Sequence, residues 1–241
     1  MDIKYKMYEW IKDLFPICRS ITGKGVRETL YYFKKQVPNL KIKSIKSGSK
    51  VFDWKVPDEW IIKDAYIKDQ KNKKIVDFKK NNLHVVGYSK YVKGWIKYKD
   101  LLKKLYYLKG QPKAIPYITT YYKRDWGFCL PYNIKKKLKK KKHFVLIDSK
   151  FIKGKLNYGE IYIKGKSKKE IFLSTYICHP SMANNELSGP VVTIGLAKWL
   201  KNLKNRKYSY RIVLAPETIG SLVYLKRNLK KLKKNVIAAF N

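Results

Sequence analysis

A histidine and an acidic residue stand where an α/β protein can carry out metal or acid–base chemistry. His179 follows residues 171–177, an apolar stretch typical of a buried strand. A polar loop with Asn184, Asn185 and Glu186 comes next and leads into an apolar helix. Ligand and metal sites of open α/β sheets lie at the carboxyl ends of strands, so this segment is the first candidate site. The alternative is a structural histidine in the turn before a capped helix.

Glu217 occupies the corresponding place after the next predicted strand, residues 210–215. Successive right-handed β-α-β units place adjacent strand ends side by side, so His179 and Glu217 can converge although they are 38 positions apart. An imidazole with carboxylates is a ligand set that zinc prefers. Glu217 can instead act as a general base toward a metal-bound water, or as an acidic cap of the helix beginning near Ile219. These three roles stay open.

The elements that must position these residues form a β-α-β-α-β pattern from Glu170 onward. Strands and helices alternate there, at 171–177, 189–203, 210–215, 219–229 and 236–240. Continuous apolar strands alternating with helices indicate an α/β protein with a mainly parallel sheet covered on both faces. The chain stops directly after a strand that needs a covering helix, so we expect it to be the N-terminal part of a larger protein.

Two amphipathic helices and a β-rich stretch precede this pattern. The helices are predicted from apolar stripes at Tyr8, Ile11, Leu14 and Phe15, and at Val26, Leu30, Phe33 and Val37. Short strand-like segments follow at 41–47, 51–56, 64–68, 74–78 and 84–88. Beyond them we expect a helix at 94–108, an aromatic strand-like piece at 121–130, a lysine-rich helix, and strands near 143–147 and 157–163.

The net charge of +39 does not by itself indicate a nucleic-acid partner. Of the 56 basic residues only six are arginine, and the lysines are spread over nearly every predicted element. Lys, Ile, Tyr and Asn are all abundant, and A/T-rich codons specify all four, so genome base composition accounts for the charge. Arginine-rich clusters and a recognisable nucleic-acid module are missing from the sequence, so we expect no specific nucleic-acid partner.

The cysteine content and the apolar runs of the sequence indicate the cellular compartment in which the protein folds. Three cysteines, an odd number without metal-ligand spacing, fit a reducing cytosol better than a disulfide scaffold. No apolar run approaches the ~20 residues of a membrane span, and the start of the sequence lacks the apolar core of a signal peptide. We therefore expect a cytoplasmic protein without membrane association.

Several motifs in fixed order carry a resemblance to a known family. They are LFPICRSITG (14–23), VFDWKVP (51–57), NLHVVGYS (82–89), AIPY (114–117), WGFC (126–129), residues 174–190, and PETIGS (216–221). Together they resemble a bacterial family of aminopeptidase-like proteins of uncharacterised function. That family is related to the di-zinc aminopeptidases and carboxypeptidases, and its genes are associated with surface-polysaccharide biosynthesis.

This resemblance implies a particular fold and domain order. The core is expected to be phosphorylase/hydrolase-like, as in zinc aminopeptidases, and to comprise residues 1–44 and 110–241. A small β-rich inserted domain is expected at 45–109. Members resembling this chain continue into more peptidase core and a C-terminal winged-helix domain, so the resemblance also implies truncation at the C-terminus.

The di-zinc peptidase pattern assigns roles to residues that match it. His179 matches the first metal ligand, and Glu217 matches one member of an acidic pair, as ligand or as base. The position that bridges two metals falls on Asn184 or Asn185, with Glu186 adjacent, and a neutral amide does not neutralise two cations ~3.5–4 Å apart. Either Glu186 substitutes, one metal binds, or hydrolysis has been lost. A later Asp and a later His ligand would lie beyond the chain.

The predicted site therefore has metal ligands His179, Asn185 and Glu217 for one or two zinc ions. Glu217 and Glu186 are the predicted catalytic residues. Arg19, in a glycine-rich turn, is a predicted substrate-binding residue that can bind a carboxylate or anchor a helix end.

The resemblance implies a zinc-dependent hydrolase that acts on a peptide or amide bond and is linked to surface-polysaccharide biosynthesis. Its expected substrate is a peptide or an acylamino-saccharide, and Trp126 is the second predicted substrate-binding residue. The alternative is a non-catalytic binding or regulatory module with the same fold. Homo-oligomerisation stays open.

Overall fold

The computed structural model describes residues 3–241, which divide into two compact units. The first unit runs to Glu59 and resumes from Lys153 to Asn241. The second unit is Trp60–Ile152. Each unit has its own sheet, and each is described by itself below.

A mixed sheet of five strands forms the centre of the first unit. Its spatial order is β1 (Lys41–Lys46), β10 (Lys155–Ile163), β12 (Ser209–Ala215), β11 (Glu170–Tyr176) and β13 (Val236–Phe240). β11 is parallel to β12 and β13, whereas β10 is antiparallel to β12 and β1. The expectation of a mainly parallel sheet is therefore corrected to a mixed one. The chain leaves this unit after β1 and returns along β10, and such antiparallel neighbours need no crossover helix.

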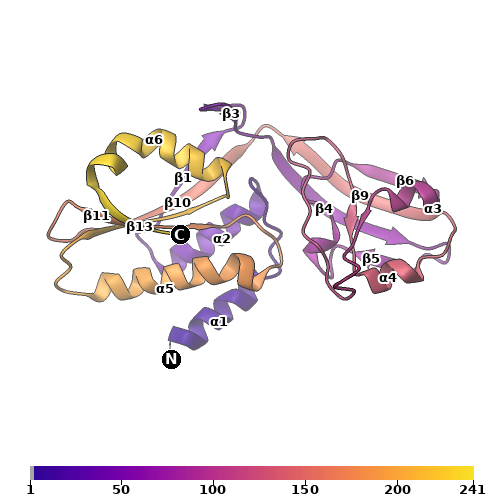
Figure 1. Cartoon of the computed structure of the whole chain (residues 1–241), viewed down its shortest axis with the longest axis horizontal. Helices are drawn as coiled ribbons and strands as arrows, with labels where there is room; N and C mark the ends of the chain where they lie inside the picture. Colours follow the sequence, from indigo (N-terminus) through magenta and orange to yellow (C-terminus); the bar gives the residue numbers. More distant parts are fainter. Residues whose placement is uncertain (1–2) are drawn as a thin grey trace. The chain divides into compact units, whose positions relative to one another are not determined.

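Helices cover both faces of this sheet (Figure 1). One face carries α1 (Ile3–Leu14), α2 (Lys24–Gln36) and α5 (Ser188–Asn202), and α6 (Ile219–Asn235) covers the other. The bounds of these helices follow the apolar spacing of the sequence, because residues three and four apart share one face.

The main core lies between the sheet and the first three helices. Leu30 and Phe33 of α2 and Ile194 of α5 are fully buried there, against Ile161 and Ile212 of the strands. Burial of such side chains contributes about 1.5–3 kcal/mol each, which is how short amphipathic helices become stable. This packing fixes α1, α2 and α5 beside the strands that carry the candidate site.

The opposite face of the sheet holds a buried charge network under α6. Arg211 of β12 pairs with both oxygens of Glu170, at 2.6 and 2.8 Å, and lies 3.2 Å from Glu160. Tyr224 of α6 donates to Glu160 at 2.5 Å and packs edge-on against Tyr158. Successive β-strand residues alternate between faces, so the same strands serve the apolar core and this network.

The second unit is built on a four-stranded sheet. Its order is β5 (Lys74–Asp77), β4 (Glu59–Lys68), β9 (His143–Ile152) and β6 (Val92–Ile96). A small parallel pair, β7 (Leu105–Tyr106) with β8 (Phe128–Cys129), and the short helices η1 (Asn82–His84), α3 (Tyr98–Leu102) and α4 (Tyr132–Lys137) complete it. The β2 (Lys50–Val51) and β3 (Trp54–Lys55) hairpin belongs to the first unit.

Several expectations for the region now in the second unit are wrong. The segment expected as a helix at 94–108 contains β6, α3 and β7 instead, because Gly94 adopts a φ of 151° that interrupts helical periodicity. Residues 84–88 form a turn of η1 and isolated bridges rather than a strand. The aromatic piece at 121–130 is extended only at β8, and the lysine-rich helix ends at Lys137.

The compact units also divide at other positions than 45 and 109. The second unit extends to Ile152 because β9 pairs with β6 in antiparallel register, from Val92 opposite Ile147 to Ile96 opposite His143. That pairing joins segments about fifty residues apart, and local periodicity carries no sign of it. Within residues 3–241, the helices are all too short or too polar to span a bilayer.

Candidate functional site

His179 and Glu217 meet at one edge of the first unit's sheet. His179 lies three residues beyond the end of β11, and Glu217 lies two residues beyond the end of β12. Because β11 and β12 are adjacent and parallel, both residues leave the sheet at its carboxyl edge. Nε2 of the imidazole lies 3.1 Å from Oε2 of Glu217. The imidazole is largely buried, whereas the Glu217 side chain is 55% exposed, so the pair opens to solvent on the glutamate side.

The other ring nitrogen of His179 faces the loop that follows it. A π-helical turn at Ala183–Leu187 brings Oδ1 of Asn185 to 3.1 Å from Nδ1. Both asparagines are exposed, and the backbone carbonyl of Asn184 accepts a hydrogen bond from the hydroxyl of Ser188. Of the two asparagines at the expected bridging position, Asn185 is therefore the one that contacts the imidazole.

Glu186 is a buried carboxylate on the same turn. It is 1% exposed, and its Oε2 lies 3.4 Å from Nδ1 of His179. Burial raises the pKa of Glu186 to about 8, against the charge of Arg19, whose Nε lies 3.6 Å away, and hydrogen bonds from the backbone of His179 and Cys178. The carboxyl group is therefore largely protonated near pH 7, and a cation bound nearby would favour its charged form.

Arg19 holds the backbone of the site rather than facing solvent. Its side chain is fully buried, and its Nε donates to the carbonyl oxygen of His179 at 2.9 Å. Its Nη1 donates to the carbonyl of Leu14, the last residue of α1, at 2.7 Å. Of the two roles expected of Arg19, these contacts match the second, since the guanidinium anchors a helix end and the residue that carries the imidazole. A part in substrate binding stays a prediction.

Gly25 allows the loop that carries Arg19 to pass close to the start of α2. A Cβ at Gly25 would lie 2.1 Å from the carbonyl oxygen of Cys18, so only glycine lets α2 begin this close to the loop. The loop in turn delivers Arg19 to a residue 160 positions later in the sequence. The spacing of residues along the sequence does not predict that contact.

Two residues at the site are absent from the predicted set. The ring of Tyr176, in β11, lies 5.2 Å from that of His179 between centroids, tilted by 59°, and its hydroxyl donates to the backbone carbonyl of Asn185 at 2.6 Å. Cys178 is fully buried, and its sulfur accepts a hydrogen bond from the backbone N–H of Glu217 at 3.2 Å. Burial raises the pKa of this thiol, so it stays protonated. Both residues lie within three positions of His179 in the sequence, and this proximity is the feature from which they could have been predicted.

Backbone strain marks both strand ends. Ser181, two residues after His179, has a φ of 45°, and Thr218, next to Glu217, has a φ of 55°. A β-branched residue with positive φ is a conformational outlier. Such strain persists only where surrounding structure imposes it, and it is concentrated at functional sites. The two outliers thus coincide with the two side chains that meet at 3.1 Å.

Trp126, the second predicted substrate-binding residue, belongs to the Trp60–Ile152 unit. There it lines a hollow of about 280 Å³ with Tyr121 and Tyr122, and the ammonium of Lys104 lies 5.8 Å from its ring centroid. Its role toward substrate stays a prediction.

The site has a donor set suited to a metal ion. Cys178, His179 and Glu186 bring potential ligand atoms within 4.8 Å of one another, and Glu217 faces His179 from the other side. Imidazole nitrogen and carboxylate oxygen are ordinary zinc ligands. The neutral amide of Asn185 stands where two cations would need a shared negative charge, so these residues fit one cation rather than two.

The mixed sheet with helices on both faces belongs to a fold that solved zinc aminopeptidases share. Solved structures with this fold include a zinc aminopeptidase from Bacillus subtilis, with a TM-score of 0.62 and 12% identity, covering 100% of this chain and 68% of that one. A peptidase M28 precursor from Shewanella amazonensis matches with a TM-score of 0.60 and 11% identity, covering 97% of this chain and 69% of that one. At these identities the likeness shows the fold.

The chain belongs to the family described as a domain of unknown function, DUF4910, which matches residues 8–241. It is 50% identical over 228 residues to a Clostridium acetobutylicum protein named "Putative polysaccharide biosynthesis protein with aminopeptidase-like domain", covering 95% of this chain and 52% of that protein. A crystal structure of a peptidase from C. acetobutylicum, described as putative, matches with a TM-score of 0.92 and 49% identity over 96% of this chain and 54% of that one.

The chain therefore spans about half the length of these two relatives. The resemblance to an aminopeptidase-like family associated with polysaccharide biosynthesis is confirmed.

Proposed function

We propose that this chain carries part of the active site of a zinc-dependent hydrolase of the aminopeptidase type, with one zinc ion held by His179 and Glu217. The observation that carries the proposal is the 3.1 Å approach of Nε2 of His179 to Oε2 of Glu217 across two parallel strands. Two ligand atoms that each lie about 2.0–2.2 Å from one zinc ion are separated by roughly this distance.

The hydrogen bond on the far side of the imidazole supports the same assignment. An amide oxygen can only accept, so the Asn185 contact places the proton of a neutral His179 on Nδ1. Nε2 then directs a lone pair at a carboxylate oxygen. Two lone pairs at 3.1 Å repel each other unless a proton or a cation lies between them. Metal-binding histidines regularly donate their second ring N–H to an oxygen in this way.

The chain's own residues would divide the work at such a centre. Arg19 fixes the backbone of His179, and Asn185 fixes the orientation and tautomer of its ring. Glu217, exposed on the solvent side, is accessible to substrate and can accept or release a proton, while Glu186 places a buried carboxyl group behind the imidazole. When bound, zinc supplies Lewis-acid polarisation of a carbonyl and a lowered pKa of bound water.

The substrate class follows from the relatives rather than from the geometry. The proposed substrate is a peptide, or an acylamino group on a saccharide precursor, since the relative from C. acetobutylicum is named for polysaccharide biosynthesis and an aminopeptidase-like domain. Both contain the amide bond that this chemistry cleaves. We place this activity in the cytoplasm, in line with the cysteine usage of the sequence.

Zinc titration of the metal-free protein by calorimetry tests the proposal. The wild type is expected to bind one zinc ion per chain. His179→Ala and Glu217→Gln should each weaken binding by more than the roughly 10–100-fold that loss of an outer-shell partner costs. Glu28→Gln, which changes an exposed glutamate on α2, is the matched control and should bind zinc as the wild type does.

Activity then separates the enzyme from a non-catalytic relative. The complete protein should release p-nitroaniline from aminoacyl p-nitroanilides, and Glu217→Gln should abolish the release. Undiminished zinc binding by His179→Ala would refute the metal site. Tight zinc binding without hydrolysis of any amide substrate would instead favour a binding or regulatory module, a role that Asn185 at the bridging position makes chemically reasonable.

A further inference from the structure

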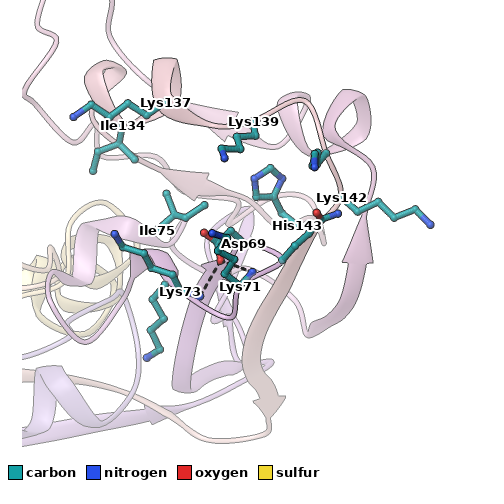
Figure 2. A pocket seen from close by; sticks show the side chains of 12 residues that line it. Asp69, Lys71, Lys73, Ile75, Ile134, Lys137, Lys139, Lys142 and His143 are labelled. Atoms are coloured by element: carbon teal, nitrogen blue, oxygen red, sulfur yellow. Dashed lines mark hydrogen bonds between the residues drawn. The ribbon is translucent and has the colours of Figure 1, made fainter.

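A basic hollow in the second unit has a composition that neither the fold nor the proposed site explains. It has a volume of about 380 Å³ and lies between the turn joining β4 to β5 and the segment from α4 to β9. This volume is near the lower end for pockets that bind small molecules. Figure 2 shows His143 beside Lys139 in this hollow, with Ile75 and Ile134 pointing toward one another across it.

The lysines of this hollow are largely unneutralised. Lys74 pairs with Asp77 at 3.1 Å. Six others that line the hollow have no ion-pair partner among residues 3–241: Lys71, Lys73, Lys137, Lys139, Lys141 and Lys142. The nearby carboxylate of Asp69 is engaged by the backbone N–H groups of its own turn, at 2.9 Å each. A concave surface lined by charges of one sign concentrates its field on the counter-ion, so the hollow favours an anion.

His143 adds a second and independent indication of a ligand. It is 2% exposed, it lines the hollow, and its Nδ1 has no hydrogen-bond partner within the described chain. Burial lowers the pKa of His143, against a hydrogen bond to the backbone of Lys141 and the charge of Asp69, so the ring is neutral near pH 7.

A buried ring nitrogen without a hydrogen-bond partner is costly, because a neutral imidazole has a lone pair on one nitrogen and a proton on the other. Nδ1 of His143 therefore needs a partner that can donate or accept a hydrogen bond, and a hydroxyl group can do both.

We propose that this hollow binds an anionic saccharide unit, a sugar that carries a phosphate or a carboxylate. The lysines take the charge, Nδ1 of His143 forms a hydrogen bond with a sugar hydroxyl, and the C–H face of the ring packs on Ile75 and Ile134. A nucleic acid fits less well, since among the described residues that line the hollow there is no arginine and no Phe, Tyr or Trp on which a base could stack. This proposal does not depend on the zinc site.

Calorimetric titration with glucose 1-phosphate at about 0.15 M salt tests the proposal, because screening at that ionic strength suppresses diffuse attraction to the chain. The wild type should bind glucose 1-phosphate more tightly than inorganic phosphate or glucose. Glucuronate is the second arm and shows whether a carboxylate serves as well as a phosphate. Equal affinity for phosphate and glucose 1-phosphate would overturn the proposal, as would tighter binding of a uridine trinucleotide.

Two pairs of substitutions localise the binding. Lys73→Ala with Lys139→Ala removes two charges from opposite walls and should weaken glucose 1-phosphate binding at least about tenfold. Lys93→Ala with Lys97→Ala removes two exposed charges elsewhere in the same unit and should change it less than about twofold. Equal effects of the two pairs would show attraction to the whole surface and contradict the proposed site.

Substitution of His143 tests the hydroxyl contact. His143→Leu should reduce the affinity for glucose 1-phosphate to that for inorganic phosphate, whereas His143→Asn, which keeps a polar atom near Nδ1, should retain a preference for the sugar. If His143→Leu fails to fold, the nitrogen-15 shift of Nδ1 in the wild type serves instead. It should move with glucose 1-phosphate and not with phosphate, and a shift that stays unchanged with both would refute the contact.

Discussion

The amide of Asn185 determines the character of the candidate site at the scale of single residues. It contacts Nδ1 of His179 at 3.1 Å and carries no charge, so it orients the imidazole without adding to the attraction for cations. Two carboxyl groups flank the ring: Glu186, which is buried and has a raised pKa, and Glu217, which is exposed. This arrangement fits one cation at the Nε2 side of the ring.

Asn185→Asp should convert this site from one-metal to two-metal binding. The new carboxylate stands at the bridging position and offers the negative charge that a second ion needs. We expect the zinc stoichiometry to rise from one to two per chain, measured by calorimetry and elemental analysis. Without zinc the variant should be less stable than the wild type, because the added charge lies beside Glu186 and Glu217.

The neighbouring asparagine provides the control for this substitution. Asn184→Asp adds the same charge one residue earlier, at a position that is exposed like Asn185 but whose side chain is not held against His179. It should leave the stoichiometry at one. Equal zinc binding by the two variants would show that the location of the carboxylate is unimportant and would contradict the assignment of Asn185.

At the scale of elements, a charge network ties α6 to the central strands on the face opposite the main core. Glu160 of β10 receives hydrogen bonds from Tyr224 of α6, at 2.5 Å, and from Lys43 of β1, at 3.0 Å. Arg211 of β12 lies 3.2 Å away. Burial raises the pKa of Glu160, but these hydrogen bonds and charges outweigh it and lower the pKa below 4.5. Side chains of three elements, α6, β1 and β12, thus converge on a carboxylate carried by a fourth.

Tyr224→Phe should lower the free energy of unfolding by about 2 kcal/mol near neutral pH, since it removes a hydrogen bond to a charged group. The pKa of Glu160 is lowered in the folded state, so its contribution is complete above its ordinary value of 4.5 and is lost as the pH falls through the folded value. The difference between wild type and variant should therefore shrink below about pH 4.5. Urea denaturation over a pH series measures it.

Tyr5→Phe is the matched control for this substitution. Tyr5 lies on α1 and is 70% exposed, so removal of its hydroxyl should change stability by less than about 0.5 kcal/mol. A loss for Tyr224→Phe that stayed constant from pH 7 to pH 3 would contradict the assigned role of the Glu160 carboxylate.

At the scale of the whole molecule, the net charge of +39 predicts sequence-independent attraction to polyanions. Fluorescence anisotropy with two unrelated DNA duplexes should give equal affinities. Both should fall by roughly 10³-fold or more between about 50 and 200 mM salt, because binding releases condensed counter-ions. A duplex that kept its affinity at the higher salt while the other lost it would indicate specific recognition, contrary to the expectation from composition.

The local features of this chain were predictable from its sequence to a large extent. The helices α1, α2, α5 and α6 follow apolar spacing, and the strands β11, β12 and β13 follow continuous apolar runs. The convergence of His179 and Glu217 followed from the handedness of β-α-β units, which depends on chain order alone. Short irregular elements such as β6 and β7 were missed, because glycine conformation and non-local pairing determine them.

The tertiary structure alone decided which residues complete the site. Contacts between positions far apart, such as Arg19 with the carbonyl of His179 or β9 with β6, depend on how segments pack, and local periodicity does not record packing partners. For the same reason the mixed sheet and the boundary at Ile152 emerged only from the folded chain. By itself the sequence determined the family, the helices α1, α2, α5 and α6, and the edge of the sheet at which His179 and Glu217 lie. Packing determined that Asn185 and Glu186 lie beside the imidazole and that Arg19 holds the backbone of His179, because burial, charge and orientation at one ring are properties of the assembled structure.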